Sequence, residues 1–250
     1  MAQLIKTSNP ALNAKIFQGQ SVALDDAMTL DGTVNKTGIL LLCAIATAAY
    51  SWHTFMETRS LAAVNSLLWA GLIGGFIVAL ITIFKKEWAP VTAPIYSLLE
   101  GLVLGSLSAV LELRYPGIAI QSVSMTFGVL FVMLLAYRSH LIPVTQKLRL
   151  GIVAATGAIA LFYIAEIILS FFGIQFASIN GSGALGIGFS VVVVVVASLN
   201  LVLDFDFIES GVQARAPKYM EWYSAFGLMV TLVWLYLEIL RLLSKIRSRN

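Results

Sequence analysis

Seven long apolar runs constrain this chain more than any other feature of its sequence. They cover residues 38–56, 61–84, 89–111, 117–137, 150–173, 184–205 and 222–244. A helix rises about 1.5 Å per residue, so each run is long enough to cross about 30 Å of hydrocarbon. Because lipid offers the backbone no hydrogen-bonding partner, these runs predict helices. The short links between them predict one all-α integral membrane bundle of seven transmembrane helices.

The composition supports a membrane protein and excludes several other classes. Hydrophobic residues make up 59% of the chain and charged residues 12%, whereas about a quarter of a soluble domain is charged. Cys43 is the only cysteine, and His53 and His140 are far apart, so no clustered Cys/His metal motif exists. No pairing of a nucleophile with a base stands out, and we expect neither an enzyme nor a resident cofactor. The cations behind the net charge of +3 lie mostly between the apolar runs, as expected for the cytoplasmic loops of a membrane protein. We therefore expect no nucleic-acid partner.

The distribution of basic residues predicts a cytoplasmic amino terminus, because short cytoplasmic loops retain Lys and Arg. The first, third and fifth loops hold only Arg59 and Arg114. The amino-terminal arm and the second, fourth and sixth loops hold ten basic residues, namely Lys6, Lys15, Lys36, Lys85, Lys86, Arg138, Lys147, Arg149, Arg215 and Lys218. The last four cations of the chain break this pattern, namely Arg241, Lys245, Arg247 and Arg249. The last run therefore either crosses as a seventh span or dips in and returns.

Acidic residues inside the apolar runs are the candidates for function. They are Glu100 in the third run, Glu166 in the fifth, Asp204 and Asp206 at the end of the sixth, and Glu238 in the seventh. An ionised carboxylate at the centre of a bilayer costs about 2.5–3.5 kcal/mol even on lenient scales, so such groups face the bundle interior and mark ion paths. Two of them also have structural explanations. Glu238 is spaced to pair with Arg241 on one helix, and a protonated Glu100 would bond across helices.

Small residues in the third run predict close helix packing. Gly101 and Gly105 form a Gly-x-x-x-Gly pair, with Ser106 and Ser108 nearby. Such a surface lets a neighbouring helix approach closely, and packing is a better explanation of it than a pore.

Several segments resemble the Bax inhibitor-1 (transmembrane Bax inhibitor motif) family, in particular its longer bacterial branch. The resemblance covers residues 28–245. It depends on residues 28–37 (MTLDGTVNKT), residues 93–101 (APIYSLLEG) with 115–117 (YPG), and above all residues 203–209 (LDFDFIE) followed by 235–238 (LYLE). It implies a bundle in which six helices surround the carboxy-terminal one. It also implies a transmembrane domain over residues 37–245 and a place in the bacterial plasma membrane. The composition on either side predicts a polar cytoplasmic arm over residues 1–36 and a basic tail over 246–250.

The function that this resemblance implies is a pH-sensitive calcium leak channel gated by two carboxylates that share a proton. Asp206 matches the family aspartate of the sixth helix, and Glu238 stands where a second aspartate is usual. The pair would hold Ca²⁺ weakly and transiently. The family's arginine latch is replaced by Lys85 or Lys86, which are point charges without a bidentate fork. The alternative is a non-conducting regulator that binds a membrane AAA protease or another complex through the arm.

Overall fold

Seven long helices account for most of the chain in the computed structural model, which describes residues 26–174 and 176–249. They are α1 (Leu30–Thr58), α2 (Leu61–Phe84), α3 (Ala89–Arg114), α4 (Ile118–Arg138), α5 (Gln146–Ser170), α7 (Ala184–Gln213) and α8 (Tyr219–Arg249). Each is long and apolar enough to cross a membrane. Two short helices, the 3-10 helix η3 (Lys86–Trp88) and α6 (Ala177–Asn180), lie in connections. The predicted all-α membrane bundle is confirmed.

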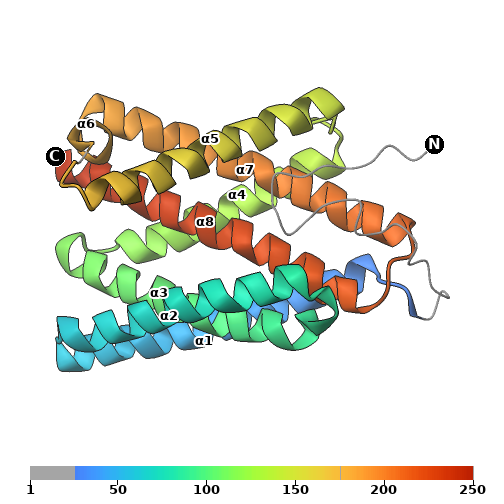
Figure 1. Ribbon diagram of the computed structural model, residues 1–250, viewed down its shortest axis with the longest axis horizontal. Helices are drawn as coiled ribbons and strands as arrows, with labels where there is room; N and C mark the ends of the chain where they lie inside the picture. The colour runs from blue at the N-terminus through green and yellow to red at the C-terminus, as the bar shows by residue number, and fades with distance from the viewer. Residues whose placement is uncertain (1–25, 175, 250) are drawn as a thin grey trace.

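The carboxy-terminal helix α8 lies at the centre of the bundle. It runs between α5 and α7 on one side and α1, α2 and α3 on the other (Figure 1). In α8, 72% of the most apolar stretch is buried, compared with 17% in α2 and 11% in α5. Glu221, Glu238 and Lys245 of α8 are all buried. Because charged side chains are costly in lipid, the helix that carries them takes the interior position, and the more uniformly apolar α2 faces outward.

The glycines of α3 bring α1 into close contact with it. A Cβ atom added at Gly105 would lie 2.6 Å from the Cα atom of Ala48, and one added at Gly101 would lie 2.9 Å from the carbonyl carbon of Ala44. Both distances are shorter than a normal van der Waals contact. The Thr47 hydroxyl donates to the Leu98 carbonyl oxygen at 2.7 Å and joins the two helices further. The Gly-x-x-x-Gly pair therefore serves helix packing, as expected from the sequence.

The start of α1 is fastened to the start of α8 through one buried carboxylate. Glu221 accepts hydrogen bonds from the Thr29 backbone N–H at 2.9 Å and the Thr29 hydroxyl at 3.0 Å, and it forms an ion pair with Lys36. A Cβ atom at Gly32 would overlap the Glu221 carboxylate. Glycine is therefore required where α1 passes over this group, and the contact fixes the amino-terminal end of the bundle.

Helix bounds differ from the predicted ones at both ends of the chain. Helix α1 begins at Leu30, because the Thr29 hydroxyl accepts a hydrogen bond from the Gly32 N–H and caps the helix. Residues 30–36 therefore belong to the first helix and not to the arm, and α8 continues through most of the predicted basic tail. The rest of the predicted arm, residues 1–25, lies outside the described residues.

Internal contacts account for three of the four cations that break the charge pattern. Arg241 pairs with Glu238. Lys245 donates to the carbonyl oxygens of Ile179 and Gly186 and to the Ser190 hydroxyl, and Arg247 donates to the carbonyl oxygen of Pro116 at 2.6 Å. Helix α8 is 31 residues long, which favours a full span.

The bundle has two opposite ends. We call the end where α1 begins the amino-side and the end where α8 ends the carboxy-side (Figure 1).

We predict that Glu221→Gln lowers the free energy of unfolding by about 3 kcal/mol, because it leaves the Lys36 ammonium without its counterion at a largely buried site. The measurement is denaturant unfolding in detergent micelles. Glu57→Gln is the matched control, since that carboxylate contacts only His53 at an exposed position, and we expect a change within about 0.5 kcal/mol. Equal stabilities of the two variants would contradict this role of Glu221.

Candidate functional site

Polar side chains, most of them buried or half-buried, follow the contact between α7 and α8 across most of the bundle. Asp204 of α7 faces Thr231 of α8, and Ser190 of α7 contacts Lys245 of α8 at 2.9 Å, so the two antiparallel helices keep one register. We call the whole set the polar ladder. In order from the amino-side, its members on α7 and α8 are Asp206, Asp204, Asn200, Glu238, Arg241, Ser190 and Lys245, and α5 adds Arg149, Thr156 and Tyr163.

The amino-side end of the ladder is an ion pair beside a polar cavity. Arg149 of α5 donates to the Asp206 carboxylate of α7 at 2.7 Å. Asp206 lines a cavity of about 260 Å³ together with His140, Glu209 and residues of the α4–α5 connection. Glu209 accepts a hydrogen bond from the Tyr137 hydroxyl. Asp206 therefore lies where a polar cavity meets the bundle.

Asp204 is the most unusual member of the ladder. Its side chain is 1% exposed, and neither carboxylate oxygen has a hydrogen-bond partner among the described residues. The hydroxyl of Thr231, the residue that it faces, bonds back to the Gly227 carbonyl oxygen at 3.4 Å. A buried carboxylate without a partner carries a large desolvation cost when it is ionised. The group must therefore be neutralised, by a proton or by a cation.

The middle and carboxy-side parts of the ladder join α5 to α7 and α8. Asn200 of α7 donates to the Thr156 hydroxyl of α5 at 2.8 Å. Further along, the Tyr163 hydroxyl of α5 donates to Glu238 of α8 at 2.9 Å and accepts from Arg241 at 2.6 Å. These contacts satisfy groups that lipid could not.

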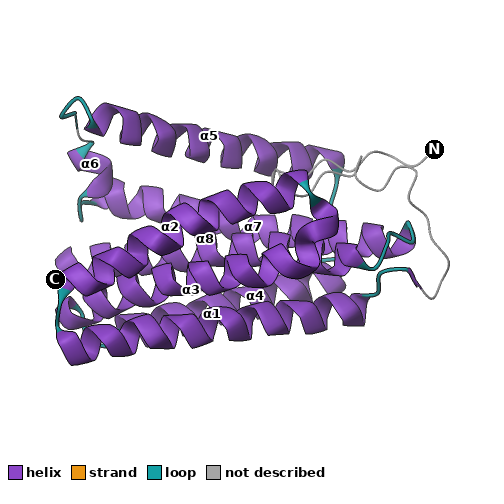
Figure 2. Cartoon of the chain, turned by 60° about the horizontal axis from the view of Figure 1, so that its bottom comes forward, coloured by secondary structure: helices purple, strands orange, loops and turns teal. Residues whose placement is uncertain are grey.

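The ladder is closed in this structure. Leu201 and Leu203 of α7 are buried between the polar members of the ladder. Helix α5 covers the outside of the ladder, although few apolar side chains of α5 are buried. Helix α5 lies along one edge of the bundle (Figure 2). Its three ladder residues are spaced seven apart, two helical turns, so they share one face. Polar contacts therefore provide much of what holds α5 in place.

The structure does not bring Asp206 and Glu238 together. Asp206 pairs with Arg149, whereas Glu238 pairs with Arg241 and Tyr163. In the α7–α8 register Asp206 lies level with Met229, nine residues before Glu238, which corresponds to about 14 Å along the axis. This arrangement does not form the predicted carboxylate pair, and the weak calcium site that the pair would form stays a prediction. Among the described residues, no three His, Cys, Asp or Glu side chains gather as metal ligands.

The other candidate residues have separate places. Lys85 ends α2 and Lys86 lies in η3. Neither forms an ion pair with Asp206 or Glu238 in the described part of the chain, and the latch position on Asp206 belongs to Arg149. Glu100 lies between α2 and α3, beside the Tyr96 hydroxyl and against Gly75. Glu166 accepts a hydrogen bond from Asn180 at the carboxy-side.

Four functional candidates were missed from the sequence, and each had a signal. Arg149, Thr156 and Tyr163 repeat every seven residues in an otherwise apolar run, which is the pattern of a polar stripe on one helix face. Asn200 precedes Asp204 by one turn. The short connection over residues 214–218 makes α7 and α8 an antiparallel hairpin, and counting back from it places Asp206 opposite the first half of α8, away from Glu238.

The fold and the ladder define a helical integral membrane protein with seven candidate spans and an acidic interior. A family model described as Bax inhibitor 1 like matches residues 9–248, and the chain belongs to this family. Neither the curated proteins nor the solved structures gave a significant match.

We predict that Arg149→Gln loosens α5, because it removes the charged partner that holds the amino-side end of this helix to α7. Hydrogen exchange of the protein in lipid nanodiscs, followed by mass spectrometry, should show amides of α5 exchanging at least threefold faster. Lys147→Gln is the matched control, a basic residue on an exposed face of the same helix turn. Unchanged exchange in Arg149→Gln, or the same increase in both variants, would contradict the role of the Asp206–Arg149 pair.

Proposed function

We propose that this protein is a cation leak of the membrane that conducts calcium and responds to pH, and that Asp204 is its proton-sensitive group. The observation that carries the proposal is the burial of the Asp204 carboxylate, which faces the Thr231 hydroxyl but has no hydrogen-bond partner within 3.5 Å among the described residues. A protonated carboxyl is neutral and tolerates this position, whereas an ionised one needs a cation beside it. Protons and cations therefore compete for one group at the bundle interior.

The polar ladder supplies a route toward Asp204 from both sides. On the amino-side, the polar cavity that Asp206 lines lies two residues from Asp204 along α7, and it would admit water and cations. Toward the carboxy-side, Asn200 and Glu238 offer oxygen ligands of the kind that Ca²⁺ prefers. Two or three oxygens at a time bind a cation weakly, which suits passage better than storage.

Helix α5 is the movable wall in this proposal. It has the least buried apolar surface of the candidate spans, and the pairs Arg149–Asp206 and Tyr163–Glu238 hold it against the ladder. Outward movement of α5 would expose the ladder to water, and return of α5 would close it. The latch is then an arginine of α5, not a lysine near the end of α2.

Family membership supports the same function, since the resemblance of this chain to Bax inhibitor-1 proteins implies a pH-sensitive calcium leak. The alternative function, a regulator that captures a membrane protease, depends on the arm. Residues 1–25 of that arm lie outside the described residues, so this function stays a prediction. The location in a bacterial plasma membrane and the cytoplasmic amino terminus likewise stay predictions.

We predict that Asp204→Asn lowers calcium flux at least tenfold and makes the remaining flux independent of pH. An amide has nearly the shape of the carboxyl group, but it does not titrate and it carries no negative charge to attract a cation. The measurement is calcium entry into liposomes that contain the purified protein and a trapped calcium dye, over a series of external pH values. Wild type should show flux that varies with pH.

The matched control for this experiment is the same change two residues away. Asp206→Asn weakens the Arg149 contact that holds α5 closed, so we expect higher flux that still varies with pH. Glu57→Gln, at an exposed position, should behave as wild type. Absence of flux in wild type at every pH, or wild-type behaviour of Asp204→Asn, would overturn the proposed function.

A further inference from the structure

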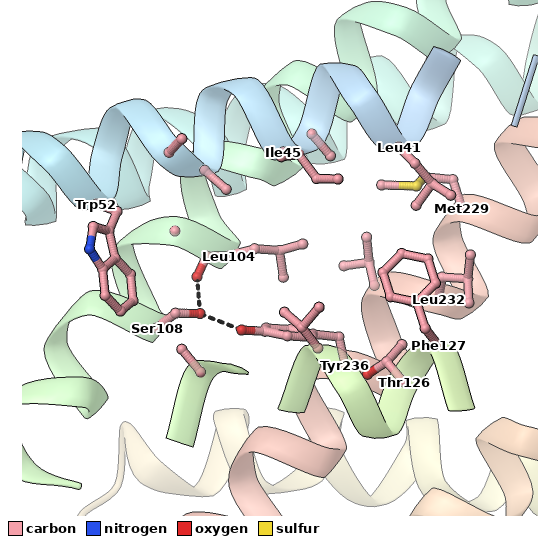
Figure 3. Close-up of a pocket in the computed structure, with 17 residues that line it drawn as sticks. Leu41, Ile45, Trp52, Leu104, Ser108, Thr126, Phe127, Met229, Leu232 and Tyr236 are labelled. Atoms are coloured by element: carbon pink, nitrogen blue, oxygen red, sulfur yellow. Dashed lines mark hydrogen bonds between the residues drawn. The ribbon is translucent and has the colours of Figure 1, made fainter. Parts of the chain in front are cut away.

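A groove of about 370 Å³ lies on the other side of α8 from the polar ladder, between α1, α3, α4 and α8. Helices α1 and α4 form its two flanks, and Gly105 of α3 leaves space at its floor. Trp52 and Ser108 lie at one end, and Leu41 and Phe127 lie toward the other (Figure 3). The groove is therefore elongated along the helices.

Every hydroxyl group that lines the groove already has a hydrogen-bond partner. Three hydroxyl side chains are among its lining. Ser108 is 2.6 Å from the Tyr236 hydroxyl and bonds to the Leu104 carbonyl oxygen at 2.5 Å. Thr126 bonds to the Ser122 carbonyl oxygen at 2.8 Å. The remaining lining is almost entirely apolar, so an ordered water would find too few partners there, and an apolar occupant would cost no hydrogen bond.

The groove opens sideways toward the lipid. Ile45 on the α1 flank is 54% exposed, and Phe127 on the α4 flank is 42% exposed. Both helices are candidate membrane spans, and these residues lie inside their apolar stretches. Lipid hydrocarbon is therefore the medium that faces the opening.

The length and depth of the groove match one acyl chain. On α4 the lining begins at Ala119, in the first turn at the carboxy-side, and ends at Phe127, near the middle of the helix. On α1 it covers Leu41 to Trp52, about 16 Å of rise. That is about half of the 30 Å thickness of the hydrocarbon, the depth of one leaflet.

We infer that this groove binds one acyl chain of a phospholipid from the carboxy-side leaflet. The chain enters between α1 and α4, with its ester end near Trp52 and Ala119 and its methyl end near Leu41 and Phe127. The inference does not depend on ion conduction, because it concerns the opposite face of α8.

The test uses the full-length protein in phosphatidylcholine nanodiscs that contain a phosphatidylcholine with a diazirine on one acyl chain. After illumination, peptide mapping by mass spectrometry locates the labelled residues. A diazirine next to the ester should label near Trp52 and Ala119, and one at the chain end should label near Leu41 and Phe127. Labels in the reverse order, or no more labelling in the groove than at Phe76, an exposed residue of α2, would overturn the inference.

Two variants that fill the groove from different helices are used, so that misfolding of one variant does not leave the inference untested. Ala49→Phe on the α1 flank and Val123→Trp on the α4 flank should each reduce labelling of the groove at least fivefold. Ala46→Phe is the matched control, an exposed alanine of α1 that does not line the groove, and its labelling should equal that of wild type. Wild-type labelling in either filled variant that keeps a native elution volume would contradict the inference.

Discussion

The constraint on which this structure depends is that lipid cannot satisfy a charged or hydrogen-bonding side chain, so the chain must bring such groups together in its interior. Helix α8 carries Glu221, Glu238 and Lys245, and each of them finds partners from other elements or from its own helix. These partners place α8 at the centre and fix its contacts with α1, α5 and α7. Apolar packing through the glycines of α3 then completes the bundle around it.

Among the described residues, several buried polar atoms lack a hydrogen-bond partner, including the hydroxyls of Ser97, Ser106 and Ser224, and Asp204 is the only carboxylate among them. The proposed function rests on this carboxylate. Asp204 has no hydrogen-bond partner among the described residues, although its neighbours in the polar ladder are paired. Natural proteins retain such groups at functional sites, where the instability is part of the mechanism. The pairs around it act differently, since Arg149–Asp206 and Tyr163–Glu238 hold a lightly packed helix in place. In the proposed function, the ladder therefore combines a proton-sensitive centre, Asp204, with a movable wall, α5.

The sequence predicted the helices and the Glu238–Arg241 pair, but not the partners that acidic residues find on other helices. The lengths of the apolar runs predicted seven spans, because the hydropathy of a segment decides whether it can cross lipid. The central position of the last helix was predicted from the family resemblance. The start of α1 was missed because Asp31 and Lys36 interrupt the apolar pattern, whereas a cap at Thr29 and the distant Glu221 set it. Asp206 and Glu238 lie apart in this structure, because partners depend on the register between helices, which composition does not encode.

Infrared difference spectroscopy on the protein in lipid tests most directly whether protons and cations compete for Asp204. The account predicts a carboxylic acid band from a buried group that calcium removes from the wild-type spectrum and that Asp204→Asn lacks. A wild-type band that calcium leaves unchanged, or the same calcium-sensitive band in Asp204→Asn, would contradict it.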